Sequence, residues 1–84
     1  MKIYRASGEI ETLEDTSLAG MQKAVGGYIE MVATNDGRTL IVNEDGKMNN
    51  LPFNLKASEL VRGVLHNTDI ILGDVIIADH NELD

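Results

Sequence analysis

The scarcity of aromatic residues constrains the fold of this chain most strongly, because it contains two tyrosines, one phenylalanine and no tryptophan. Aromatic side chains otherwise supply much of the buried area of a core. A small domain buries only about 60% of the surface that its unfolded chain exposes, so the core must come from Ile, Val, Leu and Met. Such residues favour strands packed on helices. The 84 residues allow one domain, residues 1–84.

Strands are indicated over residues 1–6, 9–13, 28–34, 39–42 and 69–79, where apolar residues alternate with polar ones or form short runs. Asp36-Gly37 separates the third strand from the fourth and predicts a hairpin with a type I′ turn. Gly73 interrupts the last segment, which predicts either a bulge in one central strand or a turn between two short strands.

Two helices are indicated by apolar residues at helical spacing. The first follows the capping residues 15–17 and ends at Gly26-Gly27, because glycine adopts the left-handed conformation without steric cost. The second begins after Asn54, a potential N-cap, and runs to Val64. The predicted core comprises Leu18, Met21, Val25, Ile29, Ile41, Ile71, Val75 and Ile77.

The element order is β-β-α-β-β-α-β. We expect an α+β domain in which both helices cover one face of a mixed sheet, as in a ubiquitin-like β-grasp fold. A small curled barrel is the second architecture that fits this order. Residues 79–84 are expected to form a frayed tail.

The charge balance excludes several functions, because 14 acidic residues against 7 basic ones give a net charge of −7. Nucleic-acid binding requires a basic face, and here no two basic residues are adjacent. The same repulsion argues against anionic membrane surfaces. The chain has no cysteine, and its longest apolar run, Val75–Ala78, is far shorter than a bilayer span. We therefore expect a cytoplasmic protein that binds neither nucleic acid nor membranes directly.

Motifs for catalysis and cofactor binding are incomplete. Gly46-Lys47 resembles the end of a phosphate-binding loop, but Ile41 and Met48 occupy positions that require Gly and Ser or Thr. His66 and His80 do not have the spacing of metal ligands. No serine lies at a diagnostic spacing from a base. We expect no enzymatic activity, no cofactor and no metal site.

Two polar segments are candidate interaction sites. In the first, which we call the acidic row, Glu9 and Glu11 project from the same strand face about 7 Å apart, at about 3.3 Å per residue, a spacing similar to that of backbone phosphates. Charge on an exposed strand also prevents aggregation, which is the alternative interpretation. The acidic row comprises Glu9, Glu11, Glu14 and Asp15.

The second segment is the polar loop between Asn43 and Asn54. Asparagine amides both donate and accept hydrogen bonds, so the loop can recognise a ligand. The same residues also stabilise turns, which is the alternative interpretation. The candidate recognition residues are Asn43, Glu44, Lys47 and Asn54.

Four motifs carry a family resemblance: GGYIE at 26–30, NE-x-GK at 43–47, LP-x-N at 51–54 and GDVII at 73–77. Their order and spacing resemble those of a family of small proteins from phages and mobile elements, known only as a domain of unknown function. The resemblance extends from about Leu18 to Ala78. It implies an accessory gene of a virus or mobile element and supplies no catalytic residues.

We therefore expect a non-enzymatic acidic protein that binds a host protein with a basic surface. In its sharpest form, the acidic row inhibits a defence or nucleic-acid-processing factor by nucleic-acid mimicry. The alternative is a module that binds a small ligand or nucleotide through the loop from Asn43 to Asn54.

Overall fold

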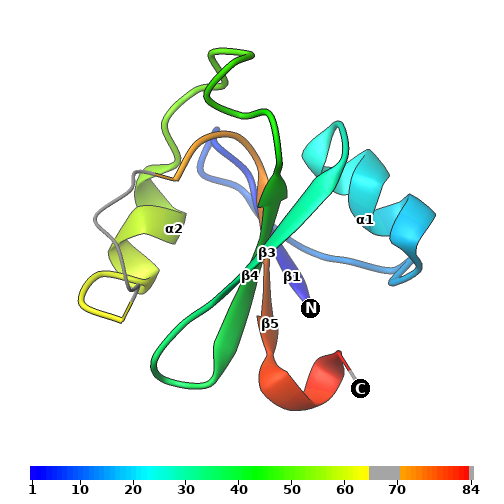
Figure 1. Cartoon of the computed structure of the whole chain (residues 1–84), viewed down its shortest axis with the longest axis vertical. Helices are drawn as coiled ribbons and strands as arrows, with labels where there is room; N and C mark the ends of the chain where they lie inside the picture. The colour runs from blue at the N-terminus through cyan, green and yellow to red at the C-terminus, as the bar shows by residue number, and fades with distance from the viewer. Residues whose placement is uncertain (65–70, 84) are drawn as a thin grey trace.

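The computed structural model in Figure 1 describes residues 1–64 and 71–83. It confirms an α+β domain with the expected order of strands and helices. The elements are β1 (Lys2–Tyr4), β2 (Ile10–Thr12), α1 (Leu18–Val25), β3 (Ile29–Ala33), β4 (Arg38–Asn43), α2 (Leu55–Leu60), β5 (Val75–Asp79) and a 3-10 helix, η1 (His80–Glu82). Within the described part of the chain, no helix is long and apolar enough to cross a membrane.

The five strands form one open sheet in the order β2-β1-β5-β4-β3. All four strand pairs among the described residues are antiparallel, so the sheet is antiparallel where a mixed one was expected. β5 lies between β1 and β4 and runs opposite to both, and the sheet ends at β2 and β3 without closing into a barrel. Across the centre of the sheet, Ile76 is paired with Ile3 on one side and with Ile41 on the other.

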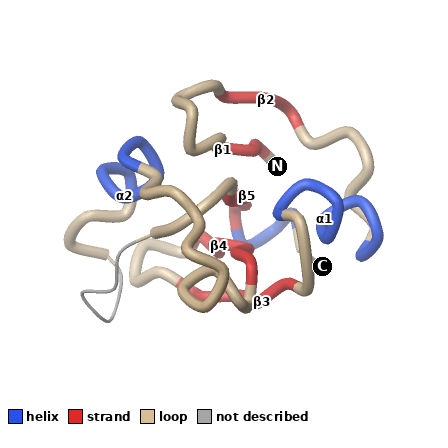
Figure 2. Tube along the Cα trace, turned by 90° about the horizontal axis from the view of Figure 1, so that it is seen from above, coloured by secondary structure: helices blue, strands red, loops and turns tan. Residues whose placement is uncertain are grey.

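The two helices cover opposite faces of the sheet, where one shared face was expected (Figures 1 and 2). The reason lies in β5, in which every residue from Val75 to Ala78 is buried. Successive side chains of a strand point to opposite faces, so both faces of this strand are apolar and each requires a cover. Beneath α1, the buried cluster contains Ile3, Ile41 and Ile76, and beneath α2 it contains Leu40, Val75 and Ile77.

Local signals set both ends of α1. The Ser17 hydroxyl accepts a hydrogen bond from the Gly20 amide, and Gly26 ends the helix with φ of 80°. The prediction of Leu18 as a core residue is wrong, because Leu18 lies on the first turn of α1 and is 58% exposed. Ile29 is partly buried, and the other predicted core residues are buried.

The described part of the second half of the chain departs from expectation in two places. α2 ends at Leu60, earlier than predicted, and turns continue to Val64. The final strand begins only at Val75, because Gly73, with φ of 76°, lies in a bend before it and not in a bulge of one continuous strand. Residues 65–70, which include the start of the expected last strand, lie outside the described residues.

Of the segment expected to fray, residues 79–82 form the last residue of β5 and η1, and Asp84 lies outside the described residues. The Glu82 carboxylate accepts a hydrogen bond from the Asp79 amide at 3.0 Å and pairs with the Met1 ammonium at 2.6 Å. Leu83 packs against the cluster beneath α1. These contacts attach residues 79–83 to the rest of the domain.

The hairpin between β3 and β4 forms at the expected place with a different turn. Gly37 has φ of 88°, and Asp36 does not have a positive φ, so the turn is not type I′. The Thr34 amide instead bonds to the Arg38 carbonyl across a three-residue loop. Asp36 accepts hydrogen bonds from the Arg38 guanidinium and the Thr34 hydroxyl, which lower its carboxyl pKa to about 2.

We expect Ile76→Ala to lower the free energy of unfolding by about 2–5 kcal/mol, because it removes a fully buried side chain at the centre of the sheet. Ile10→Ala is the matched control, since Ile10 is 50% exposed, and should cost less than half as much. Urea unfolding of both variants measures the difference. Equal losses would show that β5 does not hold the centre of the core.

The stability contributed by Asp36 in the β3–β4 hairpin should depend on pH. The pKa of Asp36 is lower in the folded state, so its stabilising contribution is complete above its ordinary pKa of 3.8 and is lost as the pH falls towards about 2. Arg38→Gln should raise the pKa of Asp36 towards 3.8, because it removes the main hydrogen bond to the carboxylate. NMR titration measures this pKa. Arg62→Gln, at an exposed arginine, is the control and should leave it unchanged.

Candidate functional site

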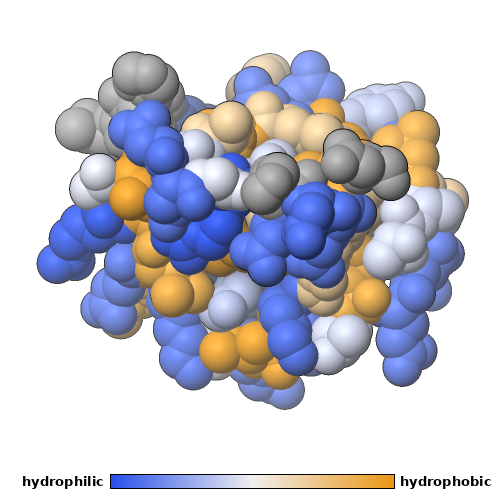
Figure 3. All heavy atoms as spheres, turned by 90° about the horizontal axis from the view of Figure 1, so that it is seen from below, coloured by the Kyte–Doolittle hydropathy of each residue, from blue (hydrophilic) through white to orange (hydrophobic). Residues whose placement is uncertain are grey.

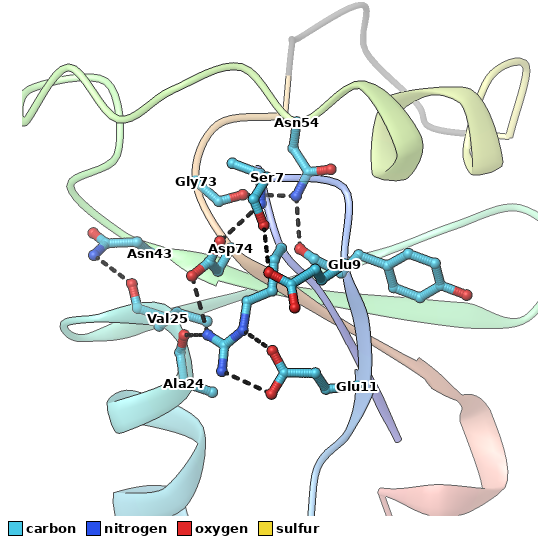
Figure 4. Close-up of polar contacts among 12 residues, drawn as sticks. Ser7, Glu9, Glu11, Ala24, Val25, Asn43, Asn54, Gly73 and Asp74 are labelled. Carbon is cyan, nitrogen blue, oxygen red and sulfur yellow. Dashed lines mark hydrogen bonds and ion pairs between the residues drawn. The ribbon is translucent and has the colours of Figure 1, made fainter.

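Arg5 lies at the centre of a polar cluster that joins three distant parts of the chain. Figure 4 shows its partners Glu11, Ala24 and Asp74. Its Nε donates to Glu11 Oε2 at 2.8 Å, and its Nη1 donates to Asp74 Oδ2 at 3.0 Å. The same Nη1 donates to the carbonyl of Ala24, in the last turn of α1, at 3.1 Å. The planar guanidinium thereby connects the β2 edge, the end of α1 and the segment leading into β5.

The charges of this cluster stabilise one another. Hydrogen bonding to Arg5 lowers the pKa of Glu11, and the two acidic partners raise the pKa of Arg5. Asp74 also accepts a hydrogen bond from the Ala6 amide at 2.8 Å, so its two carboxylate oxygens are both engaged. Arg5 and Asp74 were not predicted as partners, although Asp74 belongs to the GDVII motif. With one cation and two carboxylates, the cluster remains negatively charged.

The acidic row lies on the surface from the β1–β2 turn to the start of α1, and all four of its residues are exposed. Two of them are held by neighbours: Glu11 by Arg5, and Asp15 by the Ser17 amide and hydroxyl, whose hydrogen bonds lower the Asp15 pKa. Glu9 accepts a long hydrogen bond of 3.4 Å from the Ser7 hydroxyl. Glu9, Glu14 and Asp15 form none of the ion pairs found among the described residues.

The four candidate residues of the polar loop differ in burial. Asn43 is buried: its Nδ2 donates to the Val25 carbonyl at 3.1 Å, and its Oδ1 accepts from the Asp45 amide at 2.8 Å. Gly27 lies so close that a Cβ there would approach Asn43 Nδ2 to 2.8 Å. Asn43 therefore joins the end of α1 to the end of β4 and is not available to a ligand.

Asn54 is fully buried and connects α2 to the sheet. Its Oδ1 accepts from the Ala57 amide at 3.1 Å, as expected of the N-cap. Its Nδ2 donates to the carbonyl of Tyr4 at 2.7 Å and to that of Gly73 at 2.8 Å. All these bonds are internal, so Asn54 is a structural residue. Glu44 and Lys47, the other two candidates, are exposed.

No group of three His, Asp or Glu side chains with metal-binding geometry occurs among the described residues. The Asp74 carboxylate is engaged by Arg5 and by the Ala6 amide. His66 and Asp69 lie outside the described residues.

Asn54→Ala should lower the free energy of unfolding by at least about 2 kcal/mol, because it leaves buried backbone groups of β1, α2 and the Gly73 turn without their partner. Asn49→Ala is the control, since Asn49 is exposed in the same loop and should tolerate the change. Thermal and urea unfolding measure both. A stable Asn54→Ala variant would show that the amide is dispensable and free for another role.

Comparisons with known proteins give one positive result. Neither curated proteins nor solved structures provide a match to this chain. The expectation of a domain of unknown function is confirmed by a family model that covers the whole sequence. Over residues 1–84 the chain matches the model described as "Domain of unknown function (DUF3846)", and it belongs to that family.

Proposed function

We propose that this protein is a non-enzymatic interaction module that acts in the cytoplasm and binds a basic surface of a host protein through its acidic row. In the sharpest form of the proposal, the row imitates a nucleic-acid backbone and inhibits a defence or nucleic-acid-processing factor. The proposed origin in a phage or mobile element depends on the resemblance of the four sequence motifs.

The observation that carries this proposal is that several basic side chains form ion pairs and hydrogen bonds within the protein itself. Arg5 and Arg38 pair with carboxylates and also donate to the carbonyls of Ala24 and Leu60. Lys56 donates to the Gly8 carbonyl at 2.7 Å. These three cations are held by partners other than Glu9, Glu14 and Asp15, so they do not neutralise those three carboxylates, and the chain as a whole keeps its net charge of −7. Such a field attracts basic partners and accelerates their association.

A second observation is the fixed geometry of part of the row. The Arg5 guanidinium holds the Glu11 carboxylate, and the Ser17 hydroxyl bonds to the Asp15 carboxylate at 2.6 Å. Side chains that are already ordered lose less conformational entropy on binding. The other two residues, Glu9 and Glu14, are exposed and contribute charge without an ion pair among the described residues. The row thus combines oriented carboxylates with uncompensated ones.

The alternative, a ligand-binding loop between Asn43 and Asn54, has less support. Both amides are buried and bonded to the protein itself. A ligand would have to use the exposed residues of the loop, including Glu44 and Lys47. Thermal-shift measurements with nucleotides test this alternative, since a ligand at 100 times its dissociation constant adds about 2.7 kcal/mol of stability.

The test of the acidic row begins with affinity capture from host lysate, followed by binding kinetics with the captured protein. We expect the double variant Glu9→Lys/Glu14→Lys to slow association about tenfold, because surface charges act mainly by steering the encounter. Binding of the unaltered protein should weaken as salt increases, since the screening length falls from about 10 Å at 0.1 M to 3 Å at 1 M.

The matched control is Glu44→Lys/Glu59→Lys, which changes the net charge equally at exposed positions outside the acidic row. It should slow association much less. If both double variants behave alike, net charge and not the row attracts the partner. If the complex is insensitive to salt and tolerates both double variants, the proposal fails.

A further inference from the structure

The two edges of the sheet are built differently. β2 has three residues, and two of its polar side chains are tied to β1 or its turn: Glu11 to Arg5, and Thr12 to Lys2. β3 has five residues, Ile29–Ala33, with neither proline nor lysine. Proteins usually protect an exposed strand edge by keeping the strand short, by placing charged residues or proline in it, or by covering it with another element. β3 has little of this protection.

The backbone of β3 presents unused hydrogen-bonding groups at alternate residues. The bonds from Thr34 N to Arg38 O and from Glu44 N to Tyr28 O show that even-numbered residues face β4. The N–H and C=O groups of Ile29, Met31 and Ala33 therefore point away from the sheet. Among the described residues, no further strand lies on that side of β3.

The side chains of β3 suit pairing with an identical strand. Met31 is 51% exposed and lies on the α1 face opposite Ile41, and Ala33 is exposed on the same face. Glu30 is the single charged residue of the strand and lies on the α2 face. In the view of Figure 3, apolar atoms of the described residues reach the surface in several places between hydrophilic ones.

We propose that β3 pairs with β3 of a second copy of this chain, antiparallel and about a two-fold axis at Met31. In this register Met31 lies opposite its own image, and Ile29 lies opposite Ala33 of the other copy. All the outward backbone groups of the strand are then paired. Glu30 lies opposite Val32 and not opposite another Glu30, so the register avoids direct repulsion of like charges. The result is a continuous sheet through both copies.

The net charge of the chain predicts how this dimer responds to salt. Each copy carries −7, so the copies repel one another, and added salt should strengthen their association. The proposed binding of a basic partner has the opposite dependence. The two proposals therefore predict opposite effects of salt, and each can be refuted without refuting the other.

Sedimentation equilibrium of the full chain at micromolar to millimolar concentrations tests the proposal. We expect a dimer whose dissociation constant decreases with salt. Met31→Lys and Met31→Glu should each weaken the dimer at least tenfold, because identical charges meet at the two-fold axis. An equal mixture of the two variants should restore the dimer, since the ammonium group introduced into one copy would then face the carboxylate introduced into the other. Circular dichroism checks that both variants remain folded.

The matched control is Met48→Lys, which makes the same chemical change at a residue that is 83% exposed in the loop after β4. It should not weaken the dimer. A monomeric unaltered protein at all concentrations would overturn the proposal. So would a dimer that tolerates Met31→Lys, or a mixture of the charged variants that stays monomeric.

Discussion

The burial of β5 on both faces is the constraint on which the rest of the domain depends. Val75, Ile76 and Ile77 alternate between the two faces, and none is more than 8% exposed. A strand of this kind needs a hydrogen-bonded neighbour on each side and an apolar cover on each face. β1 and β4 supply the neighbours, and α1 and α2 supply the covers. The sheet order and the placement of both helices follow from this requirement.

Polar side chains fix the positions of these covers. Asn54 holds α2 to β1 and to the turn before β5, and Asn43 holds the end of α1 to β4. Arg5 adds a bond to α1 on the opposite side of the sheet from α2. Each of these groups satisfies backbone carbonyls that would otherwise lack a partner at a helix end or turn. A short helix such as α2 has little stability of its own, so its cap and its packing decide its place.

The features that could be predicted well from the sequence are local ones. Ser17, Gly26 and Asn54 act at the helix ends as their chemistry suggests, and the hairpin forms at Asp36-Gly37. The features that could not be predicted depend on contacts across the chain. Nothing in the run Val75–Ala78 indicates which helix covers which face, because the two neighbouring strands and both helices come from distant parts of the sequence.

Among the candidate site residues, too, exposure could be predicted from local sequence and long-range contacts could not. The glutamates and aspartate of the acidic row are exposed, as their surroundings of charged residues suggested. Asn43 and Asn54 are buried, because the carbonyls that they satisfy come from residues up to 50 positions away. An asparagine that binds a ligand and one that caps a distant backbone look identical in sequence. Arg5 was missed for the same reason, since Asp74 is 69 positions from it along the chain.

The central place of β5 has a consequence for how the chain folds as it is synthesised. The β1–β2 and β3–β4 hairpins consist of local contacts and use only residues up to Asn43. They do not bond to each other, because β5, the strand that lies between them, follows both in the sequence. Until residues 75–79 are available, no strand joins the two hairpins, and the inner edges of β1 and β4 lack their partner. The final strand then inserts between them, a step that depends on contacts of high sequence separation and is therefore slow compared with hairpin formation.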